Sequence, residues 1–125
     1  MIILIEAESE IPIYSQLTNQ VIEGIARGDL CPGDSLPSVR AFAADIGVNM
    51  HTVNKSYHEL EKRGIIKIIP KSGAVISTHT EIPESTSQRL SNELKPLIAE
   101  SLVIGMTEEK IHELVTSILK EFKQN

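Results

Sequence analysis

The fold is decided by residues 30–73, LCPGDSLPSVRAFAADIGVNMHTVNKSYHELEKRGIIKIIPKSG. Ser38 has the hydroxyl of a helix N-cap and Gly47 suits a C-terminal stop, so we predict a short helix between them. Apolar residues recur in this segment at i, i+3, i+4 and i+7, at Val39, Phe42, Ala43 and Ile46. The segment therefore predicts a helix that buries one face.

A second helix is predicted over residues 50–63, with Asn49 as its N-cap. Val53, Tyr57 and Leu60 share one face of this helix and are expected to point into the core. Two helices joined by a short turn that contains Gly form a helix-turn-helix, whose second helix enters the DNA major groove. The pattern therefore predicts a DNA-binding domain.

The flanking segments complete a winged domain over residues 1–79. Upstream, Pro12 fits the first position of a helix that ends at Gly28, and residues 2–5 are expected to form a strand or a tail on the core. Downstream, Gly64 ends the second helix, and a β-branched run then leads into a turn at residues 70–73 and a returning strand at 74–77. Helices followed by a hairpin are the element order of a winged helix-turn-helix.

The C-terminal third predicts two helices behind a linker at residues 80–86. Ser85 and Gln88 resemble a capping box, and Pro96 is expected to kink or divide the first helix. Two such helices bury too little surface to be stable alone, so their apolar faces need a partner, either the winged domain or a second subunit. We expect residues 87–125 to form a helical dimerisation segment. Its apolar residues are Leu94, Leu97, Ile98, Leu102, Ile111, Leu114, Val115, Ile118, Leu119 and Phe122. The predicted fold class is α+β and mostly helical, a winged domain with a two-helix extension.

Composition is compatible with DNA binding once the charge is located. The net charge is −5, but residues 38–73 hold six Lys or Arg against three acids, while residues 81–125 hold five against eight. A local basic face is what phosphate binding needs. The single cysteine, Cys31, excludes an internal disulfide. With no apolar run long enough for a membrane span, we expect a cytoplasmic protein without membrane contact.

A series of motifs along residues 10–77 resembles the GntR family of bacterial transcription regulators, and within it the small YtrA-like branch. The motifs are Pro12-Ile13-Tyr14, Gly28-Asp29-Leu30, Pro32-Gly33-Asp34, Leu36-Pro37-Ser38-Val39-Arg40, Gly47-Val48-Asn49, Thr52-Val53, Tyr57, Leu60-Glu61 and Arg63-Gly64-Ile65. The tail of some 45 residues is similar to the helical appendage of that branch. The resemblance implies a dimeric repressor without a large ligand-binding domain, acting on a neighbouring transporter operon.

The chain departs from the pattern of the family at three places. Ala41 stands where the family usually has an acid that completes a capping box. Met50 stands where the YtrA-like branch commonly has Pro, and the wing tip at residues 71–73 has one Gly and no Arg. The last two departures lie where DNA would be touched, so they bear on the operator sequence.

Outward-facing polar residues of the helix-turn-helix and wing are the candidate DNA contacts. Asn54 suits the edge of adenine and Met50 a thymine methyl, while Lys55, Thr52 and Arg40 suit phosphate. The family counterpart of Arg40 is a DNA contact. The full candidate set is Ser38, Arg40, Asn49, Met50, His51, Thr52, Asn54, Lys55, Lys71, Ser72 and Gly73.

Catalytic and metal-binding functions find little support in the sequence. No Gly-rich phosphate loop, nucleophile elbow or metal-ligand cluster appears, so we expect no enzyme and no cofactor. His51 and His58 lie two helical turns apart, about 10 Å, which is too far for one ion. The expected partners are double-stranded DNA and a second copy of the chain. Whether an unidentified small-molecule effector also binds is left open by the sequence. The alternative is a winged protein-interaction module that has lost specific DNA binding.

Overall fold

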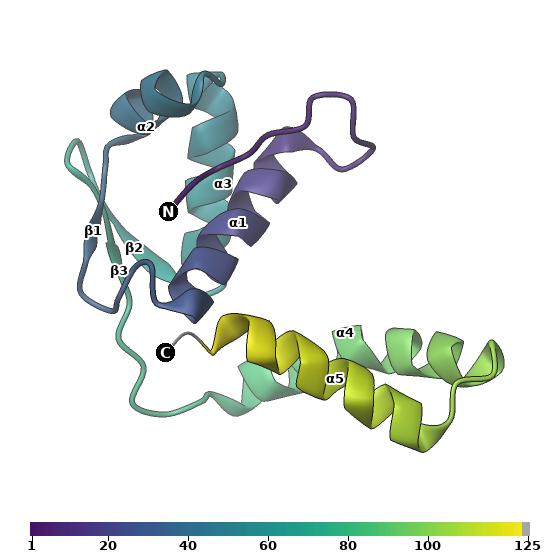
Figure 1. The fold of residues 1–125 in the computed structure, drawn as a ribbon. Coiled ribbons are helices and arrows are strands. Elements are labelled where there is room, and N and C mark those ends of the chain that lie inside the picture. The colour runs from purple at the N-terminus through teal and green to yellow at the C-terminus, as the bar shows by residue number, and fades with distance from the viewer. Residues whose placement is uncertain (124–125) are drawn as a thin grey trace. The chain divides into compact units, whose positions relative to one another are not determined.

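The computed structural model describes residues 1–123 and divides the chain into two compact units, Met1–Thr78 and the segment that begins at His79 (Figure 1). The first unit contains α1 (Ile13–Arg27), β1 (Ser35–Leu36), α2 (Val39–Ile46), α3 (Met50–Lys62), β2 (Ile66–Ile69) and β3 (Gly73–Ile76). The described part of the second unit contains α4 (Glu84–Val103) and α5 (Glu108–Phe122). The predicted α+β class, mostly helical with a winged helix-turn-helix, is confirmed.

Helix α3 is the centre of the first unit, since it packs against α1, α2 and β2 (Figure 1). Its predicted inward residues Val53, Tyr57 and Leu60 are completely buried, as are Leu17 and Val21 of α1. The apolar spacing therefore identified the buried face of α3 correctly. Burying side chains of this size contributes roughly 1.5–3 kcal/mol each to stability, so α3 is held rigidly in the domain.

The sheet has a third strand that the sequence pattern did not predict. Its order is β1-β3-β2, with both pairings antiparallel. Leu36 of β1 and Ile68 of β2 both pair with Ala74 of β3. The Tyr57 hydroxyl donates a hydrogen bond of 2.7 Å to the Pro37 carbonyl, and burial raises the pKa of this hydroxyl far above its ordinary value. The short strand is thereby tied to both the wing and α3.

The N-terminal segment forms a tail on the core, which is one of the two predicted alternatives. Ile3 and Ile5 pack against the core, and the main chain of the tail pairs with two glutamines of α1. The Gln20 side-chain amide exchanges two hydrogen bonds with the Leu4 main chain, and Gln16 does the same with Glu6. These side chains satisfy main-chain groups that a neighbouring strand would otherwise pair.

Helix α1 begins one residue later than predicted. Pro12 is its N-cap rather than its first helical residue, and the Pro12 carbonyl accepts from the N–H groups of Ser15 and Gln16. A shift of one residue is ordinary at a helix end. The predicted end holds, because Gly28 has the positive φ of 88° that a left-handed C-cap requires.

The predicted cap of α2 is confirmed, and it is only half of a capping box. The Ser38 hydroxyl accepts from the Ala41 N–H at 3.2 Å, but no acid stands in the first turn. Replacing Ala41, which is exposed, with glutamate supplies a carboxylate for the Ser38 N–H and for the helix dipole.

We therefore expect Ala41→Glu to raise the stability of the first unit by about 0.5–1 kcal/mol. Thermal unfolding followed by circular dichroism measures this as a rise of several degrees in Tm. Ala41→Lys is the matched control, because it exposes a similar side chain of the opposite charge and should give no rise. An equal rise in both variants contradicts the cap as the cause.

The second unit differs from the prediction at the start of its first helix. Helix α4 begins at Glu84, so residues 84–86 of the predicted linker are helical. Pro83 is the N-cap, and no side chain caps this helix, so the capping box predicted at Ser85 and Gln88 is wrong. The fixed φ of Pro, here −60°, starts the helix without a side-chain cap.

Helix α4 continues past Pro96 to Val103, so the proline does not divide it. Thr107 then caps α5, its hydroxyl accepting from the Lys110 N–H at 3.1 Å. Helices α4 and α5 pack against each other (Figure 1). Ile111 is the buried residue of α5, whereas α4 has none.

Candidate nucleic-acid interface

The outward face of α3 carries most of the predicted base-reading residues. His51, Asn54 and Lys55 are exposed, as is Met50 with 39% of its surface, while Thr52 is half-buried. These residues occupy the N-terminal half of α3, which is the part of a recognition helix that reaches base edges. The structure thus brings five of the candidate contacts together on one rigid surface.

The side chains of two further candidate DNA contacts are engaged as helix caps. Ser38 caps α2, and the Asn49 side-chain oxygen caps α3 by accepting from the His51 N–H at 2.7 Å. Between them the turn runs through Gly47, whose positive φ of 72° ends α2. Each cap fixes the start of one helix of the motif, so these residues orient the surface even where they touch no DNA.

The helix N-termini of the first unit carry no carboxylates. The first turns of α1, α2 and α3 hold no acid, whereas α4 begins with Glu84 and α5 with Glu108 and Glu109. Acids at this position stabilise a helix by about 0.3–1 kcal/mol, and a cation there has the opposite effect. Arg40 nevertheless lies exposed in the first turn of α2. The first unit therefore forgoes local stabilisation where a phosphate would approach.

Lys55 has an aromatic partner that sequence reasoning missed. Its Nζ lies 4.0 Å from the centre of the Tyr14 ring on α1, within the range of a cation–π contact. The two residues line a shallow surface pocket together with Ile13, His51 and Thr52. The signal could not be found by spacing, because 41 positions separate the two residues in sequence.

The wing tip combines an exposed lysine with a buried glycine. Lys71 is exposed and adopts a positive φ of 68°, which is unusual for a residue with a side chain. Ser72 is exposed as well, and its N–H closes the turn onto the Ile69 carbonyl at 3.0 Å. Gly73 is buried, and a Cβ there would lie 2.3 Å from the Leu36 carbonyl oxygen. Gly73 as a DNA contact stays a prediction, but the main chain of Leu36 and Pro37 occupies the side on which a Cβ would lie.

The second unit exposes the residues predicted to form a dimer interface. On α4, Leu94, Leu97 and Leu102 are 52–62% exposed. On α5, Leu114, Val115, Ile118 and Leu119 are 42–53% exposed. Ile98 and Phe122 are half-buried, and Ile111 is buried. Two helices with this much exposed apolar surface lack a sufficient core of their own.

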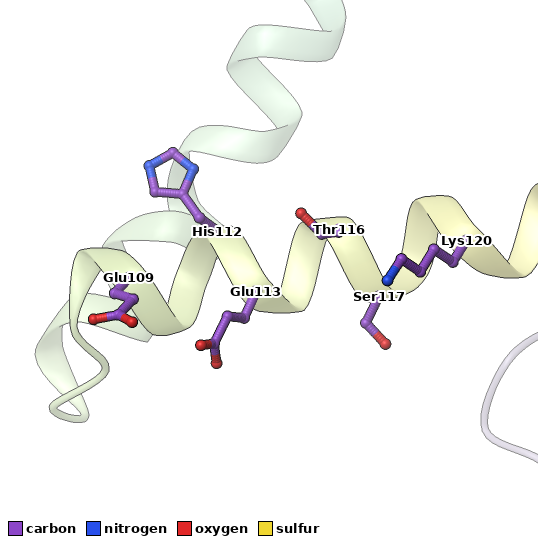
Figure 2. A pocket seen from close by; sticks show the side chains of 6 residues that line it. All are labelled: Glu109, His112, Glu113, Thr116, Ser117 and Lys120. Carbon is purple, nitrogen blue, oxygen red and sulfur yellow. The ribbon is translucent and has the colours of Figure 1, made fainter.

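The other side of α5 is polar and forms a shallow depression (Figure 2). Its lining residues all come from this one helix, namely Glu109, His112, Glu113, Thr116, Ser117 and Lys120. Lys110 and Glu113 form an ion pair at 3.3 Å along this side, and the His112 Nε2 lies 3.6 Å from a carboxylate oxygen of Glu108. Such i,i+3 and i,i+4 pairs are typical of a solvated helix face.

Comparison with known proteins identifies a matching family and a similar relative. The family described as "Bacterial regulatory proteins, gntR family" matches residues 13–76. The HTH-type transcriptional repressor YtrA of Bacillus subtilis (strain 168) is 38% identical over 123 residues, which cover 97% of this chain and 95% of that protein.

Two solved structures support the match. A transcriptional antiterminator from Listeria monocytogenes EGD-e superposes with a TM-score of 0.88 at 29% identity, covering 100% of this chain and 95% of that one. YtrA from Sulfolobus acidocaldarius, described as a GntR-family transcription factor, gives 0.68 at 41% identity, covering 82% and 99%.

The fold and its exposed recognition helix define a winged helix-turn-helix transcription regulator that binds DNA. The chain belongs to the GntR family, and within it is YtrA-like. It is accordingly a regulator and not an enzyme. None of the helices in residues 1–123 is long and apolar enough to cross a membrane.

Proposed function

We propose that the protein represses transcription as a homodimer bound to a palindromic operator. The observation that carries this proposal is the pairing of two surfaces in one chain, a recognition helix with an acid-free N-terminus and a helical segment with an uncovered apolar face. A closed two-fold dimer presents two recognition helices to two half-sites about 34 Å apart or a multiple of this distance. Repression is supported by the name of the relative YtrA.

In this proposal the candidate residues of the first unit contact different parts of the DNA. Asn54 reads adenine through a bidentate pair and Met50 contacts a thymine methyl group. Arg40, Thr52 and Lys55 bind phosphates, as do His51 beside Thr52 and Lys55 and Lys71 and Ser72 at the wing tip. The regulator acts in the cytoplasm, on a neighbouring transporter operon as the YtrA-like resemblance implies. A small-molecule effector remains an open part of the proposal.

Fluorescence anisotropy on duplexes tiled across the DNA upstream of the gene, at two salt concentrations, tests the proposal. We expect tight binding to one palindromic tile. Asn54→Ala should weaken binding to that tile by about 5- to 150-fold, since a bidentate base contact contributes about 1–3 kcal/mol, and should change binding to the other tiles little. Arg40→Ala should weaken binding to every tile and reduce the salt slope by about one.

Asn92→Ala on α4, which also removes an exposed amide, is the matched control and should leave binding unchanged. Uniformly weak binding that neither Arg40→Ala nor Asn54→Ala alters contradicts the operator proposal. That result favours the alternative of a winged module that binds another protein.

A further inference from the structure

Tyr14 and Lys55 meet at the place where α1 and α3 are locked together. The Thr18 hydroxyl donates to the Tyr14 carbonyl at 2.7 Å, and its oxygen lies 2.8 Å from the Ser56 hydroxyl. Since the single hydrogen of Thr18 is used on Tyr14, Ser56 must donate to Thr18. Thr18 and Ser56 are both buried. This chain of hydrogen bonds holds the main chain of α1 at Tyr14 against α3 at Ser56, the residue after Lys55.

The ring restricts the long side chain of Lys55. Lys55 is exposed and has a four-carbon stem, which loses rotamer freedom whenever its ammonium group is immobilised. With Nζ 4.0 Å from the ring centre, part of this freedom is already lost in the free protein. A ligand of Lys55 then binds with a smaller entropic cost.

The surroundings of Lys55 favour an anion of the DNA backbone. The pocket that it shares with Tyr14 is lined by Ile13, His51 and Thr52, none of which is acidic. The hydroxyl of Thr52 can donate to the same oxygen that the ammonium group binds. The ring covers one side of the ammonium group, so its remaining N–H donors point away from the ring. A phosphate beside α3 matches this set of donors.

We propose that Tyr14 is a positioning residue, which holds Lys55 by a cation–π contact so that its ammonium group meets a DNA phosphate already ordered. This inference rests on the DNA-binding role of α3 proposed above. It adds a residue of α1, outside the helix-turn-helix, to the recognition surface. The competing view is that Lys55 is a solvated lysine that rests on the ring without effect on binding.

The test measures binding of the full chain to the operator tile and to a duplex of unrelated sequence at low salt, because a phosphate contact acts on both. Lys55→Met removes the charge and keeps the stem, and should lower the salt slope by about one. Tyr14→Leu should weaken binding about two- to fivefold, the range of a cation–π contact. Tyr14→Phe keeps the ring and should restore binding relative to Tyr14→Leu.

The double variant Tyr14→Leu/Lys55→Met is decisive. If Tyr14 acts through Lys55, the double variant should bind like Lys55→Met alone. An equal further loss overturns the proposal, as does a Tyr14→Phe variant that binds as poorly as Tyr14→Leu. Lys110→Met on α5 is the control for removal of a lysine charge and should leave the salt slope unchanged.

A readout without DNA separates this inference from the proposed function. In the free protein the ε-methylene protons of Lys55 should be shifted upfield in NMR spectra by the Tyr14 ring, and the shift should vanish in Tyr14→Leu. If the shift is present and the wild type binds no duplex, DNA recognition by α3 is wrong. If the wild type binds DNA and Lys55→Met binds equally well, only the role of Lys55 and Tyr14 is wrong.

Discussion

Replacing both Leu114 and Ile118 by glutamate is expected to dissociate the proposed dimer into monomers. The two side chains lie four residues apart on one face of α5 and are 46% and 45% exposed in the single chain. Complete burial of such a side chain contributes roughly 1.5–3 kcal/mol, so covering the exposed part by a second copy contributes about half of this, and a two-fold interface counts each position twice. A buried carboxylate instead costs several kcal/mol. Sedimentation velocity measures the oligomeric state of the variant directly.

The affinity for DNA should decrease when the dimer dissociates. In a dimer the second half-site is bound intramolecularly, which strengthens binding by about 10²- to 10⁴-fold over one half-site. We therefore expect the Leu114→Glu/Ile118→Glu variant to lose at least about 100-fold in operator affinity, although its recognition helix is unchanged. Circular dichroism should show that the first unit still folds.

A matched control lies on the opposite side of the same helix. Thr116 and Lys120 belong to the polar face shown in Figure 2, so Thr116→Glu/Lys120→Glu adds the same two carboxylates where water already solvates them. This variant should remain dimeric and keep its operator affinity. A dimeric Leu114→Glu/Ile118→Glu variant contradicts the proposed interface, and equal dissociation of both variants points to charge rather than to the apolar face.

Local signals account for the parts of the fold that were predicted correctly. The predicted caps Ser38 and Asn49 each accept a main-chain hydrogen bond. The spacing of apolar residues predicted the buried faces of α2 and α3. These features depend on residues a few positions apart, where helix geometry alone decides which side chains share a face. Local signals failed at the start of α4. Pro83 is the N-cap there, and no side chain caps the helix, contrary to the predicted capping box.

Long-range pairing accounts for most of what the sequence pattern missed. Strand β1 is only two residues long and carries no alternation, so it exists because β3 offers a partner. The tail residue Leu4 is held by Gln20, and Lys55 meets Tyr14, in both cases across the fold. Such contacts join residues whose separation follows from the tertiary structure. The outward-facing candidate residues of α3, by contrast, could be predicted from the helical period.

Gly73 illustrates how the same residue type admits two interpretations. A glycine at a wing tip suits close approach to DNA, and the sequence offers no means to tell this from close approach to the protein itself. In the structure the backbone of Gly73 has a φ of 117°, and the position of a Cβ is 2.3 Å from the Leu36 carbonyl oxygen and 2.9 Å from the Pro37 carbonyl carbon. The space that a side chain needs is filled by β1.

We expect Gly73→Ala to destabilise the first unit by about 2–6 kcal/mol, combining backbone strain of about 1–3 kcal/mol with overpacking of about 1–3 kcal/mol. Because the obstructing atoms belong to the main chain, the clash can be relieved only by separating β1 from β3. Chemical denaturation followed by circular dichroism measures the loss of stability. Operator affinity should fall together with the folded fraction, whereas a direct DNA contact would lose affinity at unchanged stability.

Gly33→Ala separates strain from collision. Gly33 also has a positive φ, 91°, but a Cβ there meets nothing within 4 Å. Its replacement should therefore cost only the strain of a left-handed residue, roughly 1–2 kcal/mol. The difference between the two variants isolates the contact with Leu36 and Pro37. If Gly73→Ala is no less stable than Gly33→Ala, the wing does not need close packing of β1 on β3, and a DNA contact by Gly73 becomes the better explanation.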